Sequence, residues 1–130
     1  MSSELSILAL YGLLLAVTVV LNVLTAMEQV GLMTLGGSRD EMPKLTGMAG
    51  RIARALDNSV VAMALFAPAI LILAAREGFT GTTLLAAQIF LLARLAFVPI
   101  YAFSPPVPFL RTGVWGVGFL ATIVLYLAAL

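Results

Sequence analysis

Five polar residues lie in or beside stretches of the chain that are otherwise apolar: Arg54, Asn58, Arg94, Tyr101 and Arg111. Guanidinium groups bind anions, and amide and hydroxyl groups both donate and accept hydrogen bonds. Arg54 and Asn58 are four residues apart, which places them on one face of a helix. Since polar groups are costly in hydrocarbon unless they contact protein or a wet cavity, these residues predict a buried polar site.

Other kinds of chemistry are excluded by composition. The chain has no His and no Cys, so it offers no imidazole or thiolate to a metal or haem. It also lacks a Ser-His or Cys-His nucleophile pair and any disulfide. The formal net charge is +1, which gives no field to hold a phosphate backbone. We therefore expect no metal site and no nucleic-acid partner.

The elements that position these residues are predicted to cross a membrane. The 130 residues are 62% hydrophobic and 10% charged, with a mean hydropathy of +1.14, whereas soluble domains are about one quarter charged. A bilayer core of about 30 Å needs roughly 20 apolar helical residues. Four segments are long enough, over 4–33, 48–75, 82–103 and 109–129. Short connections favour an all-α, antiparallel four-transmembrane-helix bundle forming a single domain over 1–130.

Basic residues predict the topology. Arg39, Lys44, Arg51 and Arg54 lie in or near the first loop, and Arg111 borders the third. The positive-inside rule then places these loops in the cytoplasm and both termini outside it. The first apolar stretch is longer than a signal-peptide core, so we expect it in the mature protein. High Ala and Leu usage suggests a bacterial inner membrane protein.

Polar residues form stripes on the first two predicted helices. Thr18, Asn22, Thr25 and Gln29 share one sector of the first helix, and Arg51, Arg54 and Asn58 share one of the second. Two interpretations remain open: a shared site between the helices, or interhelical hydrogen bonds that hold them together. Asp57 is three residues after Arg54 and is a candidate partner for it.

Arg94 and Arg111 each suggest an anion. Arg94 is too deep in its helix to reach water comfortably, so it needs an acceptor: Asp57, Glu28 or an anionic ligand. Arg111 falls in the first turn of the last helix, where free amide groups already favour anions. It either stabilises a bound thiolate nucleophile or is a cytoplasmic anchor.

Three segments resemble the MAPEG family, the membrane-associated proteins of eicosanoid and glutathione metabolism: Arg51–Asn58, Ala93–Tyr101 and Leu110–Trp115. Gly37–Asp40 and Leu45–Gly47 are similar to its bacterial branch. The resemblance implies a homotrimer with glutathione bound between subunits near the cytoplasmic face. By position, it assigns glutathione binding to Arg54, Asn58, Arg94 and Tyr101, and thiol activation to Arg111.

Departures from the family pattern keep two functions open. Val61 and Ala62 stand where the family has a Glu, often followed by Tyr, and Phe97 replaces a Tyr of eicosanoid-forming members. Losing such contacts lowers the expected affinity for glutathione, unless Asp57 or a polar residue of the first helix substitutes. The chain is then either a glutathione-dependent transferase or peroxidase acting on lipophilic electrophiles, or a non-catalytic scaffold, lipid-binding module or accessory subunit of a larger membrane complex.

Overall fold

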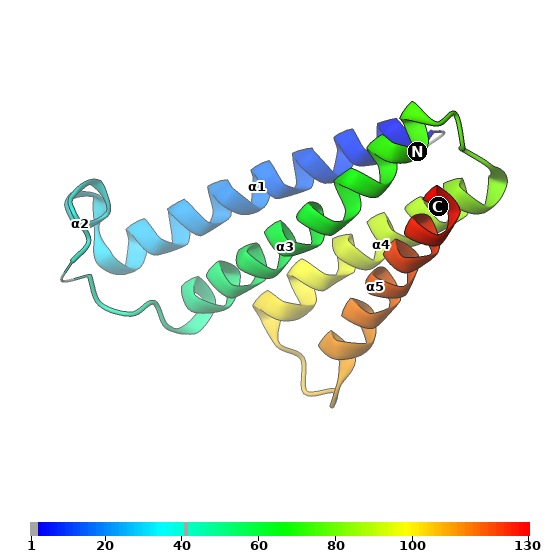
Figure 1. Ribbon diagram of the computed structural model, residues 1–130. Helices are drawn as coiled ribbons and strands as arrows, with labels where there is room; N and C mark the ends of the chain where they lie inside the picture. The colour runs from blue at the N-terminus through cyan, green and yellow to red at the C-terminus, as the bar shows by residue number, and fades with distance from the viewer. Residues whose placement is uncertain (1–2, 41) are drawn as a thin grey trace.

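Four long helices and one short helix make up the structure, a computed structural model that describes residues 3–40 and 42–130. In chain order the helices are α1 (Glu4–Val30), α2 (Leu32–Gly36), α3 (Gly47–Ala75), α4 (Gly81–Phe103) and α5 (Leu110–Ala129). The four long helices form a bundle (Figure 1). The predicted all-α four-helix fold is therefore confirmed, and three of the four predicted ranges agree with the structure to within one residue.

The first predicted helix, over 4–33, is interrupted. Its regular part ends at Val30, because Gly31 has a φ of +88°, and the short helix α2 follows. A positive φ ends an α-helix and is adopted readily only by glycine. The first helix therefore ends three residues earlier than the sequence predicts.

The outer surface of the bundle is apolar. All four long helices are long and hydrophobic enough to cross a membrane. On α1, the side chains of Leu13, Val17, Val20 and Leu24 point outward and are each at least half exposed. Every backbone polar group in hydrocarbon must be paired, and helices satisfy this internally. The chain is thus a multi-pass integral membrane protein.

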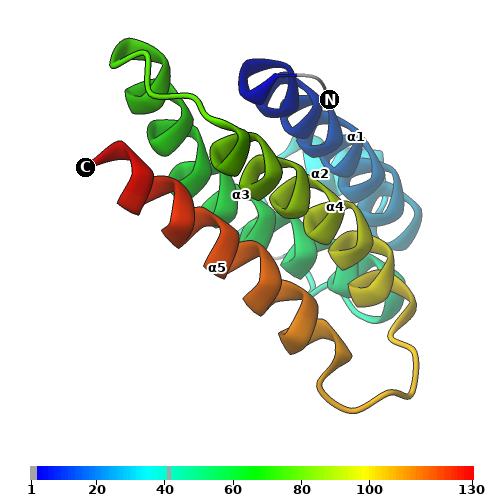
Figure 2. The ribbon, with the colours of Figure 1, turned by 90° about the vertical axis from the view of Figure 1, so that its right-hand side faces the viewer.

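Helix α3 lies at the centre of the arrangement. It packs against α1 on one side and against α4 and α5 on the other, while α4 and α5 pack closely together. Figures 1 and 2 both place the two termini at the same end of the bundle. The opposite end carries residues 37–40 and 42–46 and the proline-rich 104–109 loop. We call it the loop end.

An aromatic cluster at the bundle centre joins three helices. The rings of Phe66 and Phe90 stack at 3.9 Å, and Tyr11 meets Phe90 edge-on at 5.0 Å. All three side chains are buried. The Tyr11 hydroxyl donates to the Ser59 carbonyl oxygen at 2.7 Å, so its polar tip is paired while its ring fills the core. The cluster fixes how α1, α3 and α4 sit beside the candidate site.

Polar side chains connect the helix ends. At the end with the termini, the Thr83 hydroxyl donates to the buried Glu4 carboxylate at 2.6 Å. Arg76 Nη1 donates to the Ala129 carbonyl oxygen at 2.8 Å. At the loop end, Arg51 Nε donates to the Ala102 carbonyl oxygen at 2.6 Å. Arg51 and Arg76 thus satisfy C-terminal carbonyl groups, where a cation is also favoured by the helix dipole.

Candidate functional site

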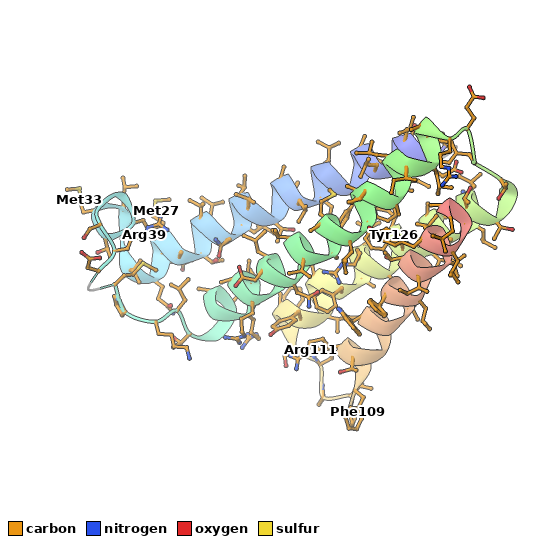
Figure 3. The ribbon with its side chains drawn as sticks, in the orientation of Figure 1. Met27, Met33, Arg39, Phe109, Arg111 and Tyr126 are labelled. Carbon is orange, nitrogen blue, oxygen red and sulfur yellow. The ribbon has the colours of Figure 1, made fainter. Side chains whose placement is uncertain are left out.

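Two guanidinium groups meet at one tyrosine ring. Arg54 Nε on α3 donates to the Tyr101 hydroxyl at 3.2 Å, and its Cζ lies 5.9 Å from the centre of that ring. Arg111 at the start of α5 places its Cζ 4.5 Å from the same ring centre. Figure 3 shows Arg111 at the loop end of the molecule. Residues from α3, α4 and α5 are thus brought together as the sequence predicted.

Neither guanidinium is paired with an acid in the described parts of the chain. The predicted pair between Arg54 and Asp57 does not form, because Arg54 turns toward Tyr101 instead. Both arginines are exposed, and the tyrosine ring offers them only its weakly attractive π-face. Two cations at one ring without a carboxylate beside them favour a bound anion.

A pocket of about 180 Å³ lies beside Arg111 and Tyr101. We call it the site pocket; it is lined by Asn58, Phe97, Tyr101, Arg111, Thr112 and Trp115. The Asn58 Oδ1 atom is buried and has no partner among the described residues. Buried polar atoms are normally hydrogen-bonded, so an unpaired amide oxygen here points to a missing N–H or O–H donor.

The start of α5 adds further anion-binding capacity. Its N-cap residue, Phe109, has a φ of +61° and provides no side-chain hydrogen bond to the first turn. Arg111 is the second residue of the helix and so lies in its first turn, as predicted, where its charge is beside free backbone amide groups. Phe109 projects away from the bundle at the tip of the loop (Figure 3). A larger hollow of about 440 Å³ lies under this loop and also touches Arg111.

Arg94 is placed apart from the other predicted site residues. It is 2% exposed and does not line the site pocket. Its Nη2 donates to the Ser59 hydroxyl at 2.9 Å, and its Cζ lies 4.2 Å from the centre of the Phe97 ring. Of the three acceptors that the sequence left open, Asp57 and Glu28 do not contact Arg94. Asp57 and Glu28 are both exposed, whereas Arg94 points into the bundle.

A second, smaller pocket lies deeper along the same groove. This inner pocket has a volume of about 40 Å³ and is lined by Val61, Ala62, Leu65, Phe90, Arg94, Trp115, Gly118, Phe119 and Thr122. Trp115 borders both pockets, which together form a groove between α3 and α5 with α4 as its floor. Val61 and Ala62 contribute apolar side chains to this deeper part of the groove.

The polar stripe of α1 does not reach this groove. The hydroxyls of Thr18 and Thr25 bond to carbonyl groups of their own helix. Gln29 makes three hydrogen bonds to Thr46 and so fastens the start of α3. For these three residues the structure favours structural hydrogen bonding over a site shared with Arg54 and Asn58, whereas the buried Oδ1 atom of Asn22 has no partner among the described residues.

Three residues next to these groups were missed by the sequence reasoning. Ser59 and Tyr11 lie beside Arg94, and Trp115 lines both pockets. Ser59 directly follows Asn58, and a step of one residue turns a helix by about 100°, so the two face different sides of α3. For Ser59 and Tyr11, the available signal in the sequence was a polar side chain inside an apolar span.

Comparison with known proteins gives a family. No curated protein and no solved structure is significantly similar to the chain. The model of the MAPEG family matches residues 7–130, which is nearly the whole chain. The match covers α1 from Ile7 onward, the other three long helices and the residues that line the groove. The chain belongs to the MAPEG family.

Proposed function

We propose that the protein is a glutathione-dependent transferase or peroxidase that acts on lipophilic electrophiles. The observation that carries the proposal is the pair of guanidinium groups, from Arg54 and Arg111, against one tyrosine ring with no acid between them. Glutathione has two carboxylates, two amides and a thiol. A tripeptide of this kind matches a site that combines cations with an unpaired amide oxygen.

Each residue of the site has a separate task in this proposal. Arg54 binds a glutathione carboxylate through a charge-assisted hydrogen bond. The unpaired Oδ1 of Asn58 accepts from an N–H of the tripeptide, and the Tyr101 hydroxyl holds Arg54 in place. Arg94 acts only indirectly, because Phe97 lies between it and Tyr101.

Arg111 is the proposed catalytic residue. Glutathione would supply the thiol nucleophile, which reacts as the thiolate. A guanidinium beside the free amides of a helix start stabilises an anion in both the ground state and the transition state. The apolar groove leads from Arg111 toward the membrane interior, so an electrophile dissolved in the bilayer has a route to the thiolate.

We further propose a homotrimer with the site at the cytoplasmic end. The site pocket of about 180 Å³ is smaller than the roughly 300 Å³ at which small-molecule pockets begin, so a second wall is needed to enclose the ligand. A neighbouring subunit supplies such a wall. Arg39, Lys44, Arg51, Arg54 and Arg111 all belong to the loop end, which favours a cytoplasmic location for it.

A second function is favoured by one specific observation. Val61, at the position of the missing family acid, and Ala62, at that of the Tyr, line a pocket of only about 40 Å³, and Phe97 offers no hydroxyl. A site that has lost these contacts would bind glutathione poorly, and the chain would then be a non-catalytic scaffold, a lipid-binding module or an accessory subunit of a larger membrane complex. The affinity for glutathione separates the two functions.

The test is calorimetric titration of glutathione into the detergent-purified protein. We expect binding in the micromolar to low-millimolar range, and loss of at least tenfold in affinity in Arg54→Ala. The matched control is Arg39→Ala, which removes an exposed guanidinium from the loop rather than from the site. If the unaltered protein does not bind glutathione, the proposed enzymatic function is rejected and the non-catalytic function is favoured.

Thiolate formation is tested separately by ultraviolet absorbance of bound glutathione. The thiolate signal should appear in the unaltered protein and disappear in Arg111→Ala, while glutathione still binds through Arg54 and Asn58. A signal that persists in Arg111→Ala would remove this residue from the catalytic role. Chemical cross-linking in native membranes provides the matching test for three subunits.

A further inference from the structure

Arg94 is a cation buried deep in the membrane-spanning part of the bundle. Its side chain is 2% exposed and lies nine residues before the end of α4 at Phe103. At 1.5 Å per residue this is about 14 Å from the loop end of the helix, close to half of a hydrocarbon core of about 30 Å. A charge at this depth is costly unless it is paired.

The described partners of the Arg94 guanidinium are all uncharged. Its Nη2 donates to the Ser59 hydroxyl at 2.9 Å, its Cζ lies 4.2 Å from the centre of the Phe97 ring, and the Tyr11 side chain is its third neighbour. Its Nε atom is buried and makes no hydrogen bond. No carboxylate in residues 3–40 or 42–130 pairs with it. Arginine stays protonated in proteins, and a buried charge without a partner is destabilising, so this side chain needs an anion from outside the chain.

The inner pocket lies beside the unused N–H of Arg94. Gly118 lines it without a side chain, and a Cβ at that position would lie 3.7 Å from Arg94 Cδ, the atom bonded to Nε. The pocket volume of about 40 Å³ is only a little larger than the roughly 30 Å³ that one water molecule occupies in the liquid. Thr122, also on the wall, already donates its hydroxyl hydrogen to the Gly118 carbonyl oxygen at 3.0 Å. Arg94 is therefore the charged group that this pocket offers to a ligand, and the ligand must be very small.

We infer that the inner pocket binds one small monovalent inorganic anion, chloride, which accepts a hydrogen bond from Arg94 Nε and neutralises the guanidinium. A chloride ion is similar in size to a water molecule, whereas phosphate and sulfate are larger and more strongly hydrated. The apolar side chains around the pocket lower the local dielectric constant, which strengthens the attraction between ion and guanidinium. The site pocket gives the ion a route from water, since Trp115 borders both pockets. This binding does not depend on glutathione and goes beyond the proposed function.

The experiment uses Trp115, the single tryptophan of the chain, as a reporter on the pocket wall. Iodide is a halide that quenches tryptophan fluorescence on contact. The protein in phosphatidylcholine nanodiscs without glutathione is titrated with sodium iodide, while sodium gluconate keeps the ionic strength constant. We expect a saturable component of quenching that chloride displaces and gluconate does not. Quenching that rises only linearly with iodide, or that chloride and gluconate affect equally, overturns the proposal.

Two substitutions locate the ion beside Arg94. Arg94→Gln removes the charge and should abolish the saturable component. If Arg94→Gln does not fold, Gly118→Ala keeps the guanidinium and adds a methyl group in contact with Arg94 Cδ, so the half-saturating iodide concentration should rise at least about tenfold. The matched control is Gly116→Ala on the same helix, where an added Cβ would have no atom within 4 Å, and where this concentration should stay within about twofold.

A halide bound at the loop end instead would be revealed by Arg111→Gln, because Arg111 and Trp115 both line the site pocket. The saturable component should persist in this variant. A component that is lost in Arg111→Gln but kept in Arg94→Gln or Gly118→Ala would place the ion in the site pocket and overturn the proposal. Equal changes in Gly118→Ala and Gly116→Ala would overturn it as well, since they would not depend on the space beside Arg94.

Discussion

The two ends of the helix bundle contain similar residue types that are used differently. At the end with the termini, Glu4 accepts a hydrogen bond from Thr83, and Arg76 donates to the Ala129 carbonyl group. At the loop end, Arg54 and Arg111 lie against Tyr101 without an acid. One end is closed by interactions within the protein, and the other has binding capacity that is not used within the described chain.

The difference shows that the partner of a charged group, rather than its type, indicates its role. Arg51 is also at the loop end, only three residues before Arg54, yet it donates to the Ala102 carbonyl oxygen and holds the end of α4. Arg51 is thus structural, while Arg54 is available to a ligand. A motif that contains both arginines cannot by itself assign either role.

The largest effect that we predict is at the loop end. Replacing both site arginines, in Arg54→Gln with Arg111→Gln, should weaken glutathione binding by about a hundredfold or more, since each charge-assisted hydrogen bond contributes about 1.5 to 3 kcal/mol. Both side chains are exposed, so the midpoint of thermal unfolding should stay nearly unchanged. Calorimetry and thermal unfolding measure the two quantities on one preparation.

A parallel loss of stability in this double variant would contradict the difference between the two ends, because Arg54 and Arg111 would then stabilise the fold. The matched control is Arg51→Gln. It should lower the unfolding midpoint through its lost contact with Ala102 and leave glutathione affinity within about twofold. Loss of glutathione affinity in the double variant, with loss of stability in Arg51→Gln, would support separate binding and structural arginines at the loop end.

A gain of affinity is predicted when the family acid is restored. Val61 is 60% exposed along the groove, so Val61→Glu should place a carboxylate where it can accept an N–H of glutathione. We expect a rise in affinity of about tenfold, equivalent to roughly 1.4 kcal/mol. Val60→Glu is the matched control, because Val60 is similarly exposed at 52% but does not line either pocket. Equal effects of the two substitutions would show a general charge effect and no specific contact.

The helices and one face of the site could be predicted from the sequence. Long apolar stretches bounded by charges define the spans, and the spacing of four residues between Arg54 and Asn58 defines one helix face. The site position of Arg111 followed from the proline-rich turn before it, and the structure places it in the first turn of α5. These features depend on local sequence alone.

The partner of Arg94 and the end of α1 could not be predicted in this way. Whether Arg94 contacts Asn58 or Ser59 depends on the rotation of α3 about its axis, because the side chains of successive helical residues point in directions about 100° apart. The break at Gly31 depends on a positive φ, and an isolated glycine in an apolar run does not reveal its backbone angle. The partner of Arg94 is thus set by packing between helices, and the end of α1 by the backbone angle of one glycine.

A moderate effect is predicted at the end with the termini. Arg76→Ala removes the hydrogen bond to the Ala129 carbonyl oxygen and a cation from the C-terminus of α5. We expect a loss of about 1 kcal/mol in the free energy of unfolding, or roughly 4 °C in the unfolding midpoint for a domain of this size. Glutathione affinity should not change. A changed affinity would mean that the two ends are coupled.

The smallest effect should come from Glu4→Gln, which separates charge from hydrogen bonding at the same end. A glutamine keeps an oxygen that can accept from the Thr83 hydroxyl, and that hydroxyl also donates to the Thr80 carbonyl group at 2.9 Å. The attraction between the carboxylate charge and the N-termini of α1 and α4 is lost, which contributes about 0.3 to 1 kcal/mol at each helix. Thermal unfolding should therefore show a decrease of a few degrees at most. A larger decrease would mean that the charge of Glu4 is balanced by a closer partner than the helix end, and the end with the termini would then contain an electrostatic site of its own.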